Sequence, residues 1–114
     1  MPECIFCEIA QKRAQADIVY EDDDCVAFRD INPQAPTHVL VVPKRHIESL
    51  STLTAEDKEL AGSLMLAAAK VAEQLGIVQP GYRVVINTNP AAGQTVFHIH
   101  LHVLGGRTFG WPPG

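Results

Sequence analysis

Three histidines alternate with apolar residues near the end of the chain, in the segment HIHLHVL at residues 98–104. Successive side chains of a β-strand point to opposite faces, so a strand over residues 96–104 would place His98, His100 and His102 on one face. The intervening apolar residues would lie on the other face, where a helix can cover them. Neighbouring histidines in such a strand are ~7 Å apart, at ~3.3 Å per residue, so the row can span one small ligand.

Two other interpretations of this row are open. The segment can be a half-exposed strand that uses histidine as its polar residue, although three of only five histidines stand at strict alternation. The three imidazoles can also form a metal tripod, as in some hydrolytic zinc sites.

The rest of the chain predicts a single α+β domain over residues 1–114. We expect a short helix at 4–13 and one long helix that begins after Thr54, carries apolar residues at helical spacing from Leu60 to Leu75, and ends at Gly76. Met65 and the alanines at 67–69 are expected to pack in the core. Strands are expected at 18–20, 25–28, 39–42, 82–86 and 96–104. Their hairpin-length connections favour a mainly antiparallel sheet with the long helix on one face, followed by a tail at 105–114.

Charge and cysteine content narrow the classes of function. Lys and Arg number 9 and Asp and Glu 13, a formal charge of −4, which argues against nucleic-acid binding through a basic face. The apolar stretches are too short to span a membrane, and no secretory signal pattern is present. The three cysteines fit metal ligands in a reducing compartment better than a disulfide framework, so we expect a soluble cytoplasmic protein.

The triad and its surroundings resemble the histidine triad (HIT) superfamily. His-apolar-His-apolar-His-apolar-apolar is the signature of that superfamily. Four further segments are similar to its Hint branch, the nucleoside phosphoramidases: DINPQAPTH at 30–38, VPKRHI at 42–47, GQTV at 93–96 and WPPG at 111–114. The resemblance implies a HIT-like fold, a mainly antiparallel five-stranded sheet with one long and one short helix. It also implies a homodimer in which two such sheets join into one of ten strands.

The resemblance implies hydrolysis of the P–N bond in purine nucleoside 5′-phosphoramidates, such as adducts of AMP with an amine. In the family the middle histidine, here His100, attacks the α-phosphorus and becomes nucleotidylated, a role that suits imidazole near neutral pH. His102 is then expected to give a proton to the leaving amine, and His38 to support His102 by hydrogen bonding. From the residues alone, His38 can equally be a structural histidine. The alternatives are a dinucleoside polyphosphate hydrolase and a non-catalytic nucleotide-binding or zinc-dependent interaction protein.

A purine nucleotide pocket is also implied by the resemblance. Asp30 is expected to bind the ribose hydroxyls, since a carboxylate can accept two hydrogen bonds, and Asn87 to bind phosphate or ribose. The segment at 93–96 can offer the phosphate backbone N–H groups and a hydroxyl. Without the resemblance, the segment at 93–96 also fits an ordinary turn before a strand. The apolar residues named next would then be core residues. The remaining expected contacts are Gly93, Gln94, Thr95 and Val96 around the phosphate, and Phe6, Ile9, Phe28 and Ile31 around a base whose identity, adenine or guanine, stays open.

Cys4 and Cys7, one helical turn apart, indicate zinc, which takes four ligands in a structural site. The resemblance to bacterial-type HIT proteins and related nucleotidylyltransferases supplies His46 and His98 as the other two ligands. We expect a structural zinc ion that takes no part in the chemical step, so that His98 serves as scaffold. The other interpretation of the cysteines is two small apolar residues in a short helix.

The tail contains the only tryptophan, Trp111, followed by two prolines. An indole on such a tail is unfavourable in water, so we expect the tail to dock against another surface. In the Hint branch each tail reaches toward the active site of the partner subunit. We therefore count Trp111 with the nucleotide pocket of the expected homodimer.

Overall fold

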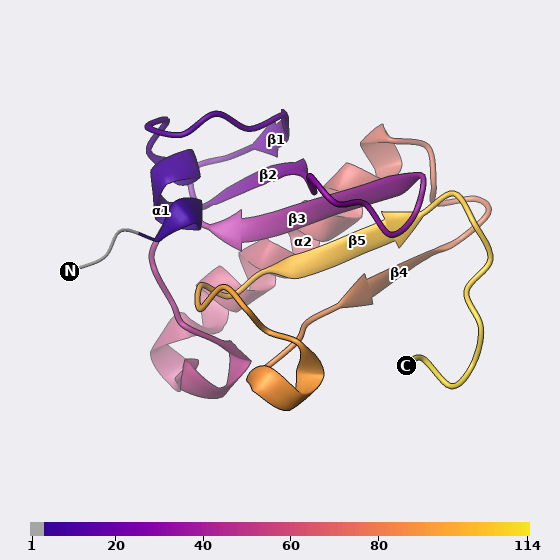
Figure 1. Ribbon diagram of the computed structural model, residues 1–114. Helices are drawn as coiled ribbons and strands as arrows, with labels where there is room; N and C mark the ends of the chain where they lie inside the picture. The colour runs from indigo at the N-terminus through magenta and orange to yellow at the C-terminus, as the bar shows by residue number, and fades with distance from the viewer. Residues whose placement is uncertain (1–3) are drawn as a thin grey trace.

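A five-stranded antiparallel sheet forms the centre of the molecule (Figure 1). The structure is a computed structural model and describes residues 4–114. The spatial order of the strands is β1-β2-β3-β5-β4, and every neighbouring pair is antiparallel. The prediction of an α+β domain with a mainly antiparallel sheet is confirmed. The strands are β1 (Ile18–Glu21), β2 (Cys25–Arg29), β3 (Thr37–Pro43), β4 (Tyr82–Val85) and β5 (Leu101–Gly105).

The two α-helices lie on opposite faces of this sheet (Figure 1). The long helix α2 (Lys58–Gln74) packs against one face, and the short helix α1 (Ile5–Ala10) packs against the other. Three 3₁₀ turns, η1 (Leu50–Thr52), η2 (Ala55–Asp57) and η3 (Pro90–Ala92), lie in the connections. Within the described residues, no helix has both the length and the apolar character needed to cross a membrane.

Strand β3 is covered on both sides, as its unbroken apolar sequence predicts. Val39 and Val41 pack toward α2, whereas Leu40 and Val42 pack toward α1. The alternation follows from the two-residue period of a strand, which sends successive side chains to opposite faces. The α1 face matters most for function, because His102 of β5, the next strand in space, and His100 just before that strand lie on this side.

The ends of α2 agree with the sequence signals. The Thr54 hydroxyl accepts a hydrogen bond from the N–H of Glu56, which caps the turn η2 that leads into the helix. Gly76 follows the helix with φ of +74°, a left-handed conformation that suits glycine. Ala67 and Ala68 are buried as expected, but the expectation for Met65 and Ala69 is wrong, because Met65 is 60% exposed on the outer face of the helix and Ala69 is exposed as well.

Helix α1 is shorter than predicted. It ends at Ala10 instead of residue 13, and Lys12 beyond it has φ of +64°, which a continuing helix does not allow.

The last strand is also shorter than predicted. Only Leu101–Gly105 pair as β5, so the expectation of a strand over all of residues 96–104 is wrong. Residues before Leu101 make other contacts: the N–H of Ile99 donates to the carbonyl of Ile47, and the side chain of Gln94 donates to the carbonyl of Glu48. These bonds attach the segment to the loop after β3. His98 and His100 therefore stand on an irregular segment, and only His102 stands on the strand.

Candidate active site

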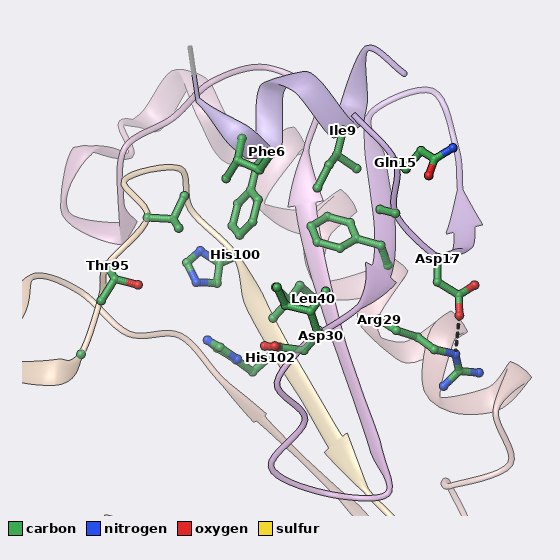
Figure 2. Close-up of a pocket in the computed structure, with 16 residues that line it drawn as sticks. Phe6, Ile9, Gln15, Asp17, Arg29, Asp30, Leu40, Thr95, His100 and His102 are labelled. Carbon is green, nitrogen blue, oxygen red and sulfur yellow. Dashed lines mark ion pairs between the residues drawn. The ribbon is translucent and has the colours of Figure 1, made fainter. Parts of the chain in front are cut away.

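A cleft of about 670 Å³ opens on the α1 side of the sheet (Figure 2). Its walls come from α1 and the loop after it, from the end of β2 and the two residues that follow it, from Leu40 in the middle of β3, and from the segment that leads into β5. Ten of the residues expected at the site line it, namely Phe6, Ile9, Phe28, Asp30, Ile31, Gly93, Thr95, Val96, His100 and His102.

His100 presents one ring nitrogen to this cleft. Its Nδ1–H donates to the backbone carbonyl of His98 at 2.8 Å, which leaves the lone pair on Nε2. The ring of Phe6 packs edge-on against the imidazole with centroids 5.0 Å apart. His100 is buried but lines the cleft, and its imidazole is held in one tautomer and one orientation.

His102 and His38 are connected in a hydrogen-bonded chain that begins at the backbone. The N–H of Gln34 donates to His38 Nδ1 at 3.0 Å, so the proton of neutral His38 sits on Nε2. That nitrogen lies 2.9 Å from Nδ1 of His102 and donates to it. The remaining proton of His102 is thereby assigned to Nε2. His38 lies behind His102, not in the cleft, and is 5% exposed.

Burial keeps this pair neutral in the free protein. Loss of hydration, together with the positive charges that His100 and His38 can carry, lowers the pKa of His102 to about 4, against a smaller opposing effect of the Asp30 carboxylate. Loss of hydration also lowers the pKa of His38, and the nearby Asp30 carboxylate opposes that shift. An Asp30 oxygen lies 3.4 Å from His38 Nε2.

Asp30 stands between the histidines and the apolar part of the cleft. One of its oxygens accepts a hydrogen bond from the N–H of Asn32 at 2.8 Å, which fixes the carboxylate at the end of β2. Ile31 beside it lines the rim but is fully exposed, so it forms an edge of the cleft and not a buried wall.

Three residues expected at the nucleotide do not line the cleft of the single chain. Gln94 is buried and structural: its amide donates to the carbonyls of Glu48 and Val96 and accepts from the N–H of Asn89. Asn87 lies outside the lining residues, and Trp111 is 84% exposed on the tail.

Sequence reasoning missed six lining residues: Ile5, Gln15, Ala16, Asp17, Arg29 and Leu40. None belongs to a motif or carries an unusual chemical group. The hairpin of β1 and β2 was the only signal, since it brings the residues that flank Ile18 and Phe28 to the same place.

Cys4, Cys7, His46 and His98 form a separate cluster next to the cleft. Their ligand atoms all lie within 4.8 Å of one another, with Cys4 Sγ and Cys7 Sγ at 3.3 and 3.5 Å from Nδ1 of His98. Nδ1 of His46 lies 3.3 Å from Cys7 Sγ and 3.2 Å from His98 Nδ1. Two sulfurs and two imidazole nitrogens at such separations fit a tetrahedral zinc ion.

The second nitrogen of His98 supports this arrangement. Its Nε2–H donates to the carbonyl of Pro43 at 2.7 Å, so Nδ1 carries the lone pair that a metal needs. Burial lowers the pKa of His98 to about 4 and keeps the ring neutral at pH 7. The ring of Phe6 on α1 contacts both His98 and His100, with centroids 5.9 and 5.0 Å apart, so His98 lies on the α1 side of the sheet as alternation predicts. Its Nδ1 is turned to the cysteines, however, and His98 does not line the cleft.

Solved structures identify the fold. A HIT family hydrolase from Legionella pneumophila matches with a TM-score of 0.96 and 49% identity, covering 98% of this chain and all of that one. A histidine triad protein from Clostridium difficile matches with a TM-score of 0.91 and 39% identity over 96% of this chain and 97% of that one. The arrangement of sheet and helices is therefore the HIT fold.

Sequence comparison agrees. The HIT domain family model matches residues 11–109, and the chain belongs to the HIT family. An uncharacterised HIT-like protein of Synechococcus elongatus is 54% identical over 112 residues, which are 98% of this chain and 97% of that protein. The purine nucleoside phosphoramidase of Escherichia coli is 49% identical over 108 residues, 95% of this chain and 91% of the enzyme.

Proposed function

We propose that the protein is a hydrolase that cleaves the P–N bond of purine nucleoside 5′-phosphoramidates through a nucleotidyl-histidine intermediate on His100. The observation that carries the proposal is the orientation of that ring, whose Nδ1–H is bound to the carbonyl of His98 while Nε2 is free to face a substrate in the cleft. The similarity to the phosphoramidase of Escherichia coli supports the choice of substrate.

The reaction has two transfers. In the first, Nε2 of His100 forms a bond to the α-phosphorus while the P–N bond breaks, and the electron pair leaves with the amine. The amine takes a proton from Nε2 of His102, whose ring centroid lies 5.0 Å from that of His100. In the second transfer, water attacks the phosphorus and gives its proton to His102, which the first transfer left neutral, while the bond to His100 breaks and a nucleoside monophosphate is released.

The low pKa of His102 concerns the free protein only. A phosphoryl group in the cleft brings negative charge next to the imidazole, and an opposite charge nearby favours the protonated form. The carboxylate of Asp30 acts in the same direction, since its negative charge raises the pKa of His102. The acid that the leaving amine needs is thus formed when the anionic substrate binds.

Other cleft residues supply the binding contacts of the proposal. Gly93, Thr95 and Val96 line the same cleft as His100 and are the proposed contacts of the phosphate, and Gly93 has φ of +90°, which favours glycine. Asp30 suits the ribose hydroxyls, because a carboxylate accepts two hydrogen bonds.

Comparison of two substrate classes tests the proposal. We expect kcat/KM for a nucleoside 5′-phosphoramidate to exceed that for a diadenosine polyphosphate by about 100-fold or more, because the site offers a proton to an amine. Release of amine and of nucleotide is measured by chromatography. The reverse preference would support a dinucleoside polyphosphate hydrolase, and binding without turnover of either class would support a nucleotide-binding module.

We also propose a structural zinc ion held by Cys4, Cys7, His46 and His98. When bound, the ion supplies no chemistry to the reaction and acts as a crosslink between α1, the loop after β3 and the segment before β5. The donor set and the ligand separations support it. Thiolate ligands need a reducing compartment, so a cytoplasmic location belongs to the same proposal.

A homodimer is the third part of the proposal, and we expect the edge strand β4 to form its interface. This strand has a neighbour on one side only, its Val84 is exposed, and Met65 and Leu66 are exposed on α2. We expect sedimentation at micromolar concentration to give a dimer, and Val84→Lys to weaken the dimer by about tenfold or more. Leu50→Lys, an exposed apolar residue on η1, is the matched control. A monomeric native protein would contradict the proposal.

A further inference from the structure

One end of the nucleoside cleft is polar, and its residues have no role in the chemistry described above. Gln15, Asp17 and Arg29 line this end, and Figure 2 shows them across the cleft from Thr95. Asp17 and Arg29 face each other, with Oδ2 and Nε 3.3 Å apart. The walls between the two ends are apolar and include Phe6, Ile9, Phe28 and Leu40.

The backbone fixes this polar end relative to the reacting end. The N–H of Arg29 donates to the carbonyl of Asp17 at 3.0 Å, which continues the pairing of β1 and β2 beyond Ile18 and Phe28. Asp30, the expected ribose partner, directly follows Arg29 in the chain. The cleft therefore presents, in order, the histidines, the ribose carboxylate, the apolar walls and the polar end.

A nucleotide with its phosphorus at His100 would extend along this order. The ribose is attached to N9 in the five-membered ring of a purine, so the six-membered ring points farthest from the phosphate. The apolar walls cover the faces of the base, and the polar end meets the edge that carries positions 1, 2 and 6. These positions distinguish guanine from adenine.

We propose that Asp17 and Arg29 read this edge and make the enzyme selective for guanine nucleotides. Guanine carries donors at N1 and N2, which a carboxylate accepts together, and an acceptor at O6, which suits a guanidinium. Adenine carries an acceptor at N1 and donors at N6, so both charged groups would face a group of the wrong kind. The amide of Gln15 can donate or accept and serves either base. The proposal rests on the proposed function for its substrate, and it names the base that this substrate carries.

Base selectivity of turnover provides the test. We measure kcat/KM for guanosine and adenosine 5′-phosphoramidates with the same amine. We expect kcat/KM to be higher for guanosine by roughly tenfold. This factor is in the lower range for one bidentate contact, because Asp17 is largely exposed to solvent. Asp17→Asn, which keeps the size of the side chain, and Arg29→Met, which keeps its apolar stem, should each reduce this ratio at least threefold. Asp23→Asn removes an exposed carboxylate outside the cleft and should leave the ratio unchanged.

Binding of GMP and AMP by calorimetry separates this proposal from the phosphoramidase proposal. A preference for GMP that Asp17→Asn reduces would support base reading even if no phosphoramidate is hydrolysed. Equal affinity and equal kcat/KM for the two bases, or a preference for adenine, would overturn it. Loss of activity toward both bases in equal proportion in Asp17→Asn would also overturn it, since a structural role predicts that result.

Discussion

His100→Asn is expected to lower kcat for nucleoside 5′-phosphoramidates by roughly 10⁴-fold or more, because the variant has no group that can bond to phosphorus. Asparagine keeps an N–H that can donate to the carbonyl of His98, as Nδ1 of the histidine does at 2.8 Å. The cleft should therefore keep its shape, and the affinity for nucleoside monophosphate should change little. Steady-state kinetics and calorimetry measure the two effects separately.

Substrates with different leaving groups distinguish the nucleophile from the proton donor. His102→Asn should slow release of an amine by roughly 10²-fold or more, because general acid catalysis contributes at least that much. The same variant should recover most of its activity on a nucleoside 5′-(4-nitrophenyl) phosphate, since nitrophenolate leaves without a proton. His100→Asn should not recover.

Chemical trapping identifies the bonded nitrogen directly. A rapid acid-free quench with a slowly hydrolysed substrate, followed by mass mapping, should find the nucleotidyl group on the peptide that contains His100. A label on another residue, or an unlabelled His100→Asn variant with more than a tenth of native activity, would contradict the mechanism.

The sequence predicted the layers of the fold well, because they depend on local periodicity. Leu64, Ala67 and Val71 face the sheet as their spacing requires, and β3 is covered on both sides. Met65 was misplaced, since spacing identifies the buried stripe of a helix but does not exclude apolar residues from the outer face. The last strand was predicted to begin too early, because residues before Leu101 bond to the carbonyls of Ile47 and Glu48, which are distant in sequence.

The residues of the candidate site also differ in how well the sequence predicts them, depending on whether their position rests on a motif or on distant contacts. Ten of the residues that the family resemblance implied line one cleft, whereas Asn87, Gln94 and Trp111 do not. The contact between His38 and His102 joins positions that no local pattern links. Alternation gave the side of the sheet on which His98 lies, but not that its Nδ1 turns to the cysteines of α1 and away from the cleft. Asp17 and Arg29 were missed because neither is chemically unusual, and only the register of the hairpin brings them to the cleft.

Cys4→Ser/Cys7→Ser is expected to abolish zinc binding and to lower the Tm by about 10 °C or more. The four ligands join three segments, namely α1, the loop after β3 and the segment before β5, and loss of a structural metal removes binding energy that is also folding energy. A loss of about 2 kcal/mol corresponds to that shift, since 1 kcal/mol changes the Tm of a domain of roughly 100 residues by about 4–8 °C. Elemental analysis and thermal melting with and without a chelator measure the two effects.

Cys25→Ala is the matched control, because Cys25 is fully buried between β2 and α2 and lies outside the cluster. That variant should keep about one zinc per chain even though it loses some packing energy. A native protein with less than about half an equivalent of zinc, together with an unchanged Tm in the double variant, would contradict the site. Because the carbonyl of His98 holds Nδ1–H of His100, metal loss should also reduce kcat more than it reduces nucleotide affinity. Equal losses in both would mean that the cluster supports the cleft as a whole, and not the orientation of the nucleophile.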